Sequence, residues 1–351
     1  MRARGKPETS PVLMDVAKAA GVSAMTVSRV INDHPNVSAR VRTRVEASIA
    51  ELGYRPNLIA RALASQRSGI IATIFPTGML DGAQAITLEA VLTAIDSSGY
   101  VGTVLPTLSR DADDVTNAVE RALSQNVDGI IIHRYSARAA VPESIPVPVV
   151  VLDGWSDEPS IATHVFTEAR AGARAVTQHL LDLGHPTVWH VAGPEAFDTS
   201  QDRIVGWRDA LTAAGRPIPP LWRTDWYPQS GYQVGQRLSE IWRWQRQGES
   251  GGQPPVSAVF AANDGLAFGV LRALVEAGIA VPGDVSLAGT DDVREANFSV
   301  VPLTTIRDDF TTIGTRAVEC LVKKINGEDT PERVVVPFEL VVRRSTGPYS
   351  P

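Results

Sequence analysis

Apolar side chains recur at helical spacing through residues 12–53 and predict three short helices there. Gly21 supplies the turn that two crossed helices require. Ser23 and Ser38 are placed to cap the second and third helices, which are expected to begin one residue later. The predicted inward faces consist of Leu13, Val16, Ala17 and Ala20, then Val27, Val30 and Ile31, then Val41, Val45, Ile49 and Leu52. This part of the chain therefore predicts a small three-helix bundle.

From residue 69 onward the pattern changes to short β-branched runs separated by helix-like stretches. The runs are GIIATIF, YVGTVL, DGIIIH, VPVVVLD, TVWHVA, SAVFAA and DVSLAGT. Strands that alternate with helices predict parallel, doubly wound sheets, so the fold class is α/β. A break near His164 indicates two such subdomains in series. The later runs LTTI, RVVVP and LVV, within residues 303–342, indicate that the chain crosses back between these lobes.

The charge is distributed unevenly along the chain. The 351 residues carry a net charge of −6 and a hydrophobic content of 44%, enough for a large buried core. Residues 1–67 hold 11 Lys and Arg against 5 Asp and Glu, whereas the remainder holds 22 against 34. A basic head on an acidic body predicts a polyanion-binding module joined to a part with a different partner. A basic segment that only improves solubility is the alternative.

Targeting signals and cysteine usage indicate a cytoplasmic protein. Cys320 is the only cysteine, which excludes an intrachain disulfide and fits a reducing compartment. The start MRARGKPETSP is not followed by the hydrophobic stretch of a secretory signal. No apolar run approaches the ~18 residues of a membrane span. We therefore expect no association with a membrane.

The sequence contains none of the common catalytic motifs. G-x-S-x-G, H-E-x-x-H, G-x-x-x-x-G-K-[ST] and a G-x-G-x-x-G after a strand are all missing. His185 and His190 flank one predicted strand and lack the helical spacing of zinc ligands, so structural roles are expected for them. We expect no enzyme, no cofactor and no metal. The alternative is an enzyme whose catalytic groups come together only in three dimensions.

Five segments near the N-terminus occur in a distinctive order. They are DVAKAAGVS, TVSRVIN, VS, ELGYRPN and LIARALAS. This combination, which runs without a gap over residues 12–68, resembles the headpiece of the LacI/GalR family of bacterial repressors. The resemblance implies a DNA-binding helix-turn-helix whose second helix lies in the major groove.

The resemblance assigns roles to individual headpiece residues. It implies that Ala24, Met25 and Arg29 face base edges, Arg29 toward guanine and the other two toward thymine methyl groups. A phosphate contact is the alternative for Arg29. The remaining exposed polar residues of this segment are expected to anchor phosphates; they are Ser23, Thr26, Ser28 and Asn32.

Residues 57–65, NLIARALAS, correspond to the hinge helix of the same family. Asn57 is a suitable N-cap, but the segment is too short to form a stable helix alone. The resemblance implies that it orders on operator DNA against its dimer mate and inserts Leu63 into the minor groove, which kinks the duplex. Ala60 would allow close approach. An ordinary linker contact is the alternative for Leu63.

The body of the chain resembles the periplasmic sugar-binding fold, which the same repressor family uses as its sensor core. The matching segments are HLLDLGH, VAGP, DRIVGW, FAANDGLAFGVL, GTDD and VPLTTI. An effector is expected between the lobes at the carboxyl ends of strands. The implied effector residues are Leu80, Asp153, Thr199, Arg203, Trp226, Asn263, Asp291 and Phe310. As alternatives, the acids could be helix caps, Arg203 could pair with Asp202, and Trp226 could belong to the core.

We therefore expect a homodimeric transcriptional regulator that binds palindromic operator DNA and represses carbohydrate-use genes until a small sugar binds its core. The predicted divisions are a headpiece (1–56), a hinge (57–68) and a core (69–351). Within the core we expect an N-subdomain of residues 69–165 plus 307–336 and a C-subdomain of residues 166–306 plus 337–351. A nucleobase or nucleoside effector is the alternative, although the broad ring of Trp226 favours a sugar. A transport-type binding protein is a further alternative, which the headpiece disfavours. No heptad repeat follows LVVRRSTGPYSP, so no C-terminal coiled coil is expected.

Overall fold

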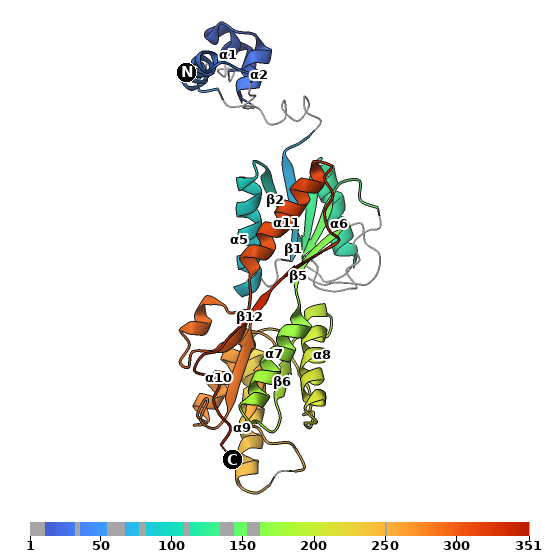
Figure 1. Ribbon diagram of the computed structural model, residues 1–351, viewed down its shortest axis with the longest axis vertical. Helices are drawn as coiled ribbons and strands as arrows, with labels where there is room; N and C mark the ends of the chain where they lie inside the picture. The colour runs from blue at the N-terminus through green and yellow to red at the C-terminus, as the bar shows by residue number, and fades with distance from the viewer. Residues whose placement is uncertain are drawn as a thin grey trace, which may run out of the picture. The chain divides into compact units, whose positions relative to one another are not determined.

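The computed structural model describes residues 11–31, 36–54, 67–76, 82–107, 112–133, 144–152, 162–249 and 251–350. The chain divides into two compact units, Met1–Gly69 and Ile70–Pro351 (Figure 1). Within the described ranges, no helix combines the length and the apolar character that crossing a membrane requires.

The first unit contains the three predicted helices, α1 (Leu13–Ala20), α2 (Ala24–Ile31) and α3 (Ala39–Leu52). Gly21 ends α1 with a left-handed backbone (φ 60°), as its role in the turn requires. The three helices pack around one small core, which consists of Val16, Ala17, Ala20, Val27, Val30, Val45 and Tyr54. The predicted three-helix bundle is confirmed.

Two details of the bundle differ from the expectation. Ser23 caps α2 as predicted, because its hydroxyl accepts the Thr26 N–H at 3.1 Å, whereas Ser38 occupies the N-cap position of α3 without a side-chain hydrogen bond. Leu52 was expected in the core but is 36% exposed at the end of α3. Tyr54, just past the Gly53 cap, is buried in the core instead.

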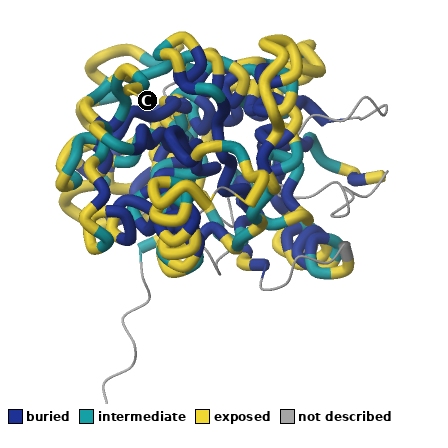
Figure 2. The backbone as a smooth tube through the Cα atoms, turned by 90° about the horizontal axis from the view of Figure 1, so that it is seen from below, coloured by how far each residue is buried: buried dark blue, intermediate teal, exposed yellow. Residues whose placement is uncertain are grey.

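Within its described residues, the second unit contains two six-stranded sheets, of which the first is entirely parallel and has the order β11-β5-β4-β3-β1-β2. Its helices α5 (Gly82–Ser97) and α11 (Phe310–Ile325) lie side by side on one face, and α6 (Ala112–Ser124) covers the other (Figure 1). The central strands β3 and β4 are buried at every position. Figure 2 shows buried segments with exposed segments around them. The strands are β1 (Ile70–Pro76), β2 (Val101–Thr107), β3 (Gly129–His133), β4 (Val149–Leu152), β5 (Thr163–Thr167) and β11 (Arg333–Val336).

The second sheet has the order β12-β10-β9-β8-β6-β7 and is parallel except for the edge strand β12. Helices α7 (Ala169–Asp182) and α8 (Asp198–Ala213) cover one face, and α9 (Pro228–Arg246) and α10 (Asp264–Glu276) cover the other. The predicted doubly wound α/β class is therefore confirmed. The strands are β6 (Trp189–Ala192), β7 (Trp222–Arg223), β8 (Ala258–Ala261), β9 (Ser286–Thr290), β10 (Thr304–Asp308) and β12 (Phe338–Val341).

The chain passes between the two lobes three times, each time through a single residue. Glu168 separates β5 from α7, and Asp309 separates β10 from α11. Pro337 separates β11 in the first sheet from β12 in the second. Glu168, at the first of these crossings, forms an ion pair with Arg333 at the start of β11, with N···O 3.3 Å.

Candidate effector site and DNA-binding face

Helix α2 presents two of the predicted base-contacting side chains to the surface. Met25 is 65% exposed and Arg29 is also exposed, while Val27 and Val30 face the core. Ala24 is half-buried and packs against the headpiece core, so it offers less surface than expected. The Ser23 and Thr26 hydroxyls lie 2.9 Å apart and hydrogen-bond to each other.

The structure does not test the DNA-binding roles predicted for several residues. Ser28 is half-buried and makes contacts within the protein. The other positions, Asn32, Asn57, Ala60 and Leu63, lie outside the described residues. Their roles, including the minor-groove insertion of Leu63, stay predictions.

Arg203 is the centre of a buried polar cluster in the second lobe. It projects from α8, and its side chain is 9% exposed. Its Nη1 donates to the Ala262 carbonyl at 2.6 Å. Its Nη2 lies 3.4 Å from Asp291 Oδ1 and 3.6 Å from Asp308 Oδ2. The guanidinium is thus held against two carboxylates, and its buried Nε has no hydrogen-bond partner among the described residues.

The ends of three parallel strands bring the partners of Arg203 together. Ala262 directly follows β8, with Asn263 next to it, Asp291 directly follows β9, and Asp308 is the last residue of β10. Because parallel strands end at the same edge of a sheet, these side chains gather there. Asp291 has a left-handed φ of 107°, and the next residue, Asp292, one of 51°. The Asp291 N–H donates to the Ile306 carbonyl at 2.8 Å, which ties this turn to β10.

Trp226 is joined to the same cluster but is largely buried. It is 8% exposed, has φ 80°, and belongs to the hydrophobic core between the second sheet and α9 and α10. The Arg203 guanidinium carbon lies 5.8 Å from its ring centroid, and Phe197 packs against it edge to face with centroids 5.5 Å apart. A Cβ at Gly193 would collide with the ring, so this position requires glycine. Trp226 is thus a core residue that also lies beside Arg203, so a structural role does not conflict with a contact to an effector.

Asn263 combines a structural role with its place in the cluster. Its Oδ1 accepts the Leu266 N–H at 2.8 Å and caps α10, and its Nδ2 donates to the Trp226 carbonyl at 3.2 Å. An amide can make four hydrogen bonds, so one acceptor and one donor site remain.

Asp264 was not predicted, yet it supports the whole edge. It is completely buried; its Oδ1 accepts the Thr305 hydroxyl at 2.7 Å, and its Oδ2 accepts the Val293 N–H at 3.0 Å. Burial, assisted by the Asp291 carboxylate, raises the pKa of Asp264 well above its usual range. In the sequence it looks like an ordinary acid in the first turn of a helix, and only the fold brings it to the Asp291 turn.

The other predicted effector residues lie apart from the Arg203 cluster or outside the described residues. Phe310 packs against the hydrophobic core of the first lobe, which is a structural role. Thr199 is half-buried in the first turn of α8, four residues before Arg203. Leu80 and Asp153 lie outside the described residues. Within the described chain, the ion pairs of Arg203 are made with Asp291 and Asp308 rather than with Asp202.

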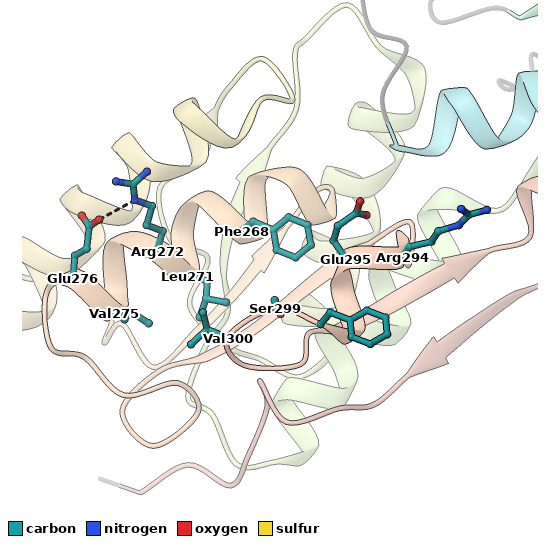
Figure 3. A pocket seen from close by; sticks show the side chains of 10 residues that line it. Phe268, Leu271, Arg272, Val275, Glu276, Arg294, Glu295, Ser299 and Val300 are labelled. Carbon is teal, nitrogen blue, oxygen red and sulfur yellow. Dashed lines mark hydrogen bonds and ion pairs between the residues drawn. The ribbon is translucent and has the colours of Figure 1, made fainter.

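A separate hollow of about 720 Å³ lies on the surface of the second lobe (Figure 3). Phe298 and Val300 beside it are 84% and 85% exposed, values that are unusual for large apolar side chains in a soluble lobe. The hollow contains none of the Arg203 cluster. It is lined by Phe268, Leu271, Arg272, Val275 and Glu276 of α10 and by Arg294, Glu295, Phe298, Ser299 and Val300.

Comparison with known proteins decides the family. Residues 12–57 match "Bacterial regulatory proteins, lacI family", and residues 177–346 match "Periplasmic binding protein-like domain". The lactose operon repressor of Escherichia coli (strain K12) is 34% identical over 348 residues, which cover 97% of this chain and 91% of that protein. The chain belongs to the LacI family. It is a DNA-binding transcriptional repressor.

A further relative and a solved structure show the same likeness over at least 95% of this repressor. The "HTH-type transcriptional repressor PurR" of Pasteurella multocida (strain Pm70) is 29% identical over 344 residues, 95% of this chain and 98% of that protein. A crystal structure of the lac repressor dimer bound to operator and the anti-inducer ONPF superposes with a TM-score of 0.83 at 31% identity, covering 97% of this chain and 100% of that one. The family resemblance is thus confirmed, and the relatives are repressors rather than enzymes, as expected.

Proposed function

We propose that this repressor binds palindromic operator DNA as a homodimer, and that a small sugar bound beside Arg203 controls its affinity for the operator. The observation that carries the proposal is the buried guanidinium against two carboxylates, with a Trp ring beside it. Likeness to the lactose operon repressor supports a carbohydrate effector.

The chemistry of the cluster suits a polyhydroxylated ligand. The oxygens of Asp291 and Asp308 accept from vicinal hydroxyls, while Arg203 donates to hydroxyl and ring oxygens. Burial strengthens each of these hydrogen bonds, because little water competes for them. Trp226, which lies beside Arg203 and is 8% exposed, would supply an apolar contact to the C–H face of a sugar. A nucleobase or nucleoside is the alternative, since it would use the same charged and aromatic groups.

The hollow beside α10 supports the homodimer. An interface with two-fold symmetry places the same surface on both partners, so that surface must complement itself. Exposed Phe298 and Val300 supply apolar contact, and neighbouring charges of both signs, Arg272 with Glu276 and Arg294 with Glu295, allow reciprocal pairing (Figure 3). The similar lac repressor structure is a dimer.

Control by a sugar requires coupling between its site and the operator. If sugar binding lowers operator affinity by some factor, operator DNA must lower sugar affinity by the same factor. We place the coupling in the hinge, residues 57–68, which in two copies would approach each other differently in the two states.

A screen of ligands on the full-length protein tests the effector. Mono- and disaccharides, nucleosides and bases are compared by the rise they cause in unfolding temperature. Hits are then tested for a change in operator affinity, measured with a fluorescent duplex. A sugar that does both supports the proposal, whereas a nucleoside or base that does so establishes the alternative. If no sugar changes operator affinity, the proposed effector class is wrong.

A further inference from the structure

His190 of β6 is a polar residue in the apolar layer between the second sheet and α8. Its ring is completely buried, stacks on Phe260 with the centroids 4.7 Å apart, and lies 5.4 Å from the Trp207 ring. Its Nδ1 lies 2.9 Å from the Phe260 carbonyl, so Nδ1 carries the hydrogen and donates it. Nε2 is therefore a bare acceptor, and it is buried without a hydrogen-bond partner in the described part of the chain.

The surroundings of His190 keep this acceptor unprotonated. Burial lowers the pKa of His190 to about 3, and positive charges nearby act in the same direction. These charges belong to Arg203, Arg208 and Arg223, whereas the hydrogen bond to the Phe260 carbonyl opposes them. At physiological pH, Nε2 therefore needs a hydrogen-bond donor.

Helix α8 contributes two more buried polar atoms on the same side of the sheet. Arg203 Nε is a donor and the Ser200 hydroxyl can donate or accept, and neither has a partner among the residues that the structure describes. Ser200 is completely buried and comes three residues before Arg203, hence on the same face of the helix. Trp207, one turn after Arg203, shares that face and contacts the His190 ring. The three atoms therefore lie in one layer of the lobe.

The register of the strands brings Arg203 next to His190. His190 pairs with Phe260 of β8, and Ala262 comes two residues later in the chain. The Ala262 carbonyl accepts from Arg203 Nη1 at 2.6 Å. Two residues of a strand advance about 6.6 Å, so the guanidinium lies about one such step beyond the His190 ring. Ala192 holds the matching place at the end of β6 and contributes only a methyl group.

The chemistry of these atoms defines what can bridge them. A group between His190 Nε2 and Arg203 Nε must donate to the first and accept from the second. A simple anion cannot donate, and a metal cation cannot accept and is repelled by the guanidinium. A water molecule does both, and buried waters typically make about three hydrogen bonds. The Ser200 hydroxyl supplies the third partner.

We propose that one internal water molecule bridges His190 Nε2, Arg203 Nε and Ser200 Oγ, and that His190 and Ser200 thereby position Arg203 for the effector. The second part rests on the proposed function, in which the effector binds beside Arg203. The described partners hold the guanidinium through Nη1 at 2.6 Å and through Nη2 at 3.4 and 3.6 Å. A contact at Nε fixes the third corner of this planar group, so its orientation is set before the effector binds.

A crystal structure of the effector-free, full-length protein tests the water directly. We expect one ordered water within about 3.2 Å of all three atoms. Its presence would support the bridge whatever the effector is. A direct hydrogen bond between His190 and Arg203, or a site without density for water, would overturn it.

Two variants test the positioning role by calorimetry, with the mono- or disaccharide that raises the unfolding temperature most in the ligand screen. Ser200→Ala removes one partner of the water, and His190→Phe removes another while it keeps a stacked ring. Each should weaken binding of this sugar by about 10-fold, the effect of one hydrogen bond to a charged group.

Ser239→Ala is the matched control for Ser200→Ala. Ser239 is also buried, with 2% exposed, but it lies in α9 on the other face of the sheet and donates to the Gly235 carbonyl. The control should bind the sugar as the unmodified protein does. Equal affinities of the Ser200→Ala and Ser239→Ala proteins would contradict the role of Ser200. Should one of the two test variants not fold, the other decides.

The double variant separates a shared water from two independent packing defects. If one water connects the residues, Ser200→Ala/His190→Phe should weaken sugar binding by about 10-fold again, rather than by the roughly 100-fold of additive losses. Additive losses would overturn the shared positioning role. A failure of the proposed function has a different signature, because Arg203→Met protein would then bind the sugar normally. The crystal structure would still decide on the water.

Discussion

At the scale of single residues, burial changes what a substitution at Arg203 is expected to do. The resemblance of the DRIVGW segment to the family implies a ligand contact for Arg203 and indicates no effect on stability. In the structure the residue is 7% exposed and is held by two carboxylates and a carbonyl. Removing one member of a buried ion pair leaves an uncompensated charge.

Arg203→Met should therefore abolish the response of operator binding to the sugar and also lower the free energy of unfolding by about 3–5 kcal/mol. Urea denaturation and operator titration measure the two effects. Arg170→Met is the control, because Arg170 pairs with Asp209 at the surface with 60% of its side chain exposed, and such pairs contribute about 1 kcal/mol or less. Similar losses in both variants would contradict the buried cluster.

The exposed surface of α2 predicts a division of labour in DNA recognition. Met25, which is 65% exposed, can contact thymine methyl groups, so Met25→Gln should change which operator half-sites are preferred. Ser28→Ala should instead weaken all sites alike, because phosphate contacts carry no sequence information. Binding to a library of randomised half-sites measures both. An unchanged preference in Met25→Gln protein would remove Met25 from the readout.

At the scale of elements, most strands could be predicted because they are short β-branched runs. Strands β5 and β7 could not be predicted in this way. Strand β5 lies where the pattern indicated a break near His164, since THVFT carries three polar residues. The polar side chain of Thr163 is tolerated in the buried strand because its hydroxyl donates to the Pro331 carbonyl at 2.9 Å. Strand β7 has two residues and too little pattern to detect.

Some residues of the candidate site could be predicted from the sequence, and others could not. Arg203, Asn263 and Asp291 were predictable because their motifs resemble the family and follow predicted strands. Asp308 and Asp309 are adjacent acids, and only the pleat of β10 decides which of them joins Arg203: Asp308 lies on the same side of the strand as Ile306, which is buried under α7 and α8. Sequence spacing alone does not show which of the two acids contacts Arg203.

His190 of β6 is buried beside β8 and α8, and its burial makes the free energy of unfolding depend on pH. The unfolded His190 binds a proton below about pH 6.5, but the folded one does so only near 3. Stability should therefore decrease as pH falls below 6.5, by about 2 kcal/mol near pH 5 from this residue. The raised pKa of Asp264 acts in the opposite direction. His190→Phe should remove the histidine contribution, which urea unfolding of both proteins near pH 5 and 7 measures; parallel pH profiles would contradict it.

At the scale of the whole molecule, the two units have opposite charge, and that should govern how DNA binding responds to salt. Residues 1–67 have an excess of 6 positive charges, and the remainder has an excess of 12 negative charges. Phosphate contacts by the head release counterions, so operator affinity should fall steeply with salt concentration. Fluorescence titration across a salt series measures the slope. A flat profile would argue against the basic head as the DNA module.

The hollow beside α10 predicts a variant that separates the subunits. Phe298→Asp should place charge in the interface and shift the protein to monomers in sedimentation velocity, with a large loss of operator affinity because only one half-site is then bound. Ile218→Asp is the control, because Ile218 is 47% exposed in the same lobe and does not line the hollow. A dimeric Phe298→Asp protein would place the interface elsewhere.

The three single-residue crossings have a consequence for dissecting the molecule. A fragment that stops after Thr167 would lack β11 and α11; because α11 packs against β3, β4 and β5, Ile131, Val150 and Val165 would lose part of their cover on one face of the first sheet. A fragment that begins at Glu168 would carry α11 and β11 with no sheet to join. Neither lobe can be produced by cutting the gene once, and limited proteolysis at one crossing should leave the two pieces associated. Separate lobes require rejoined, non-contiguous segments.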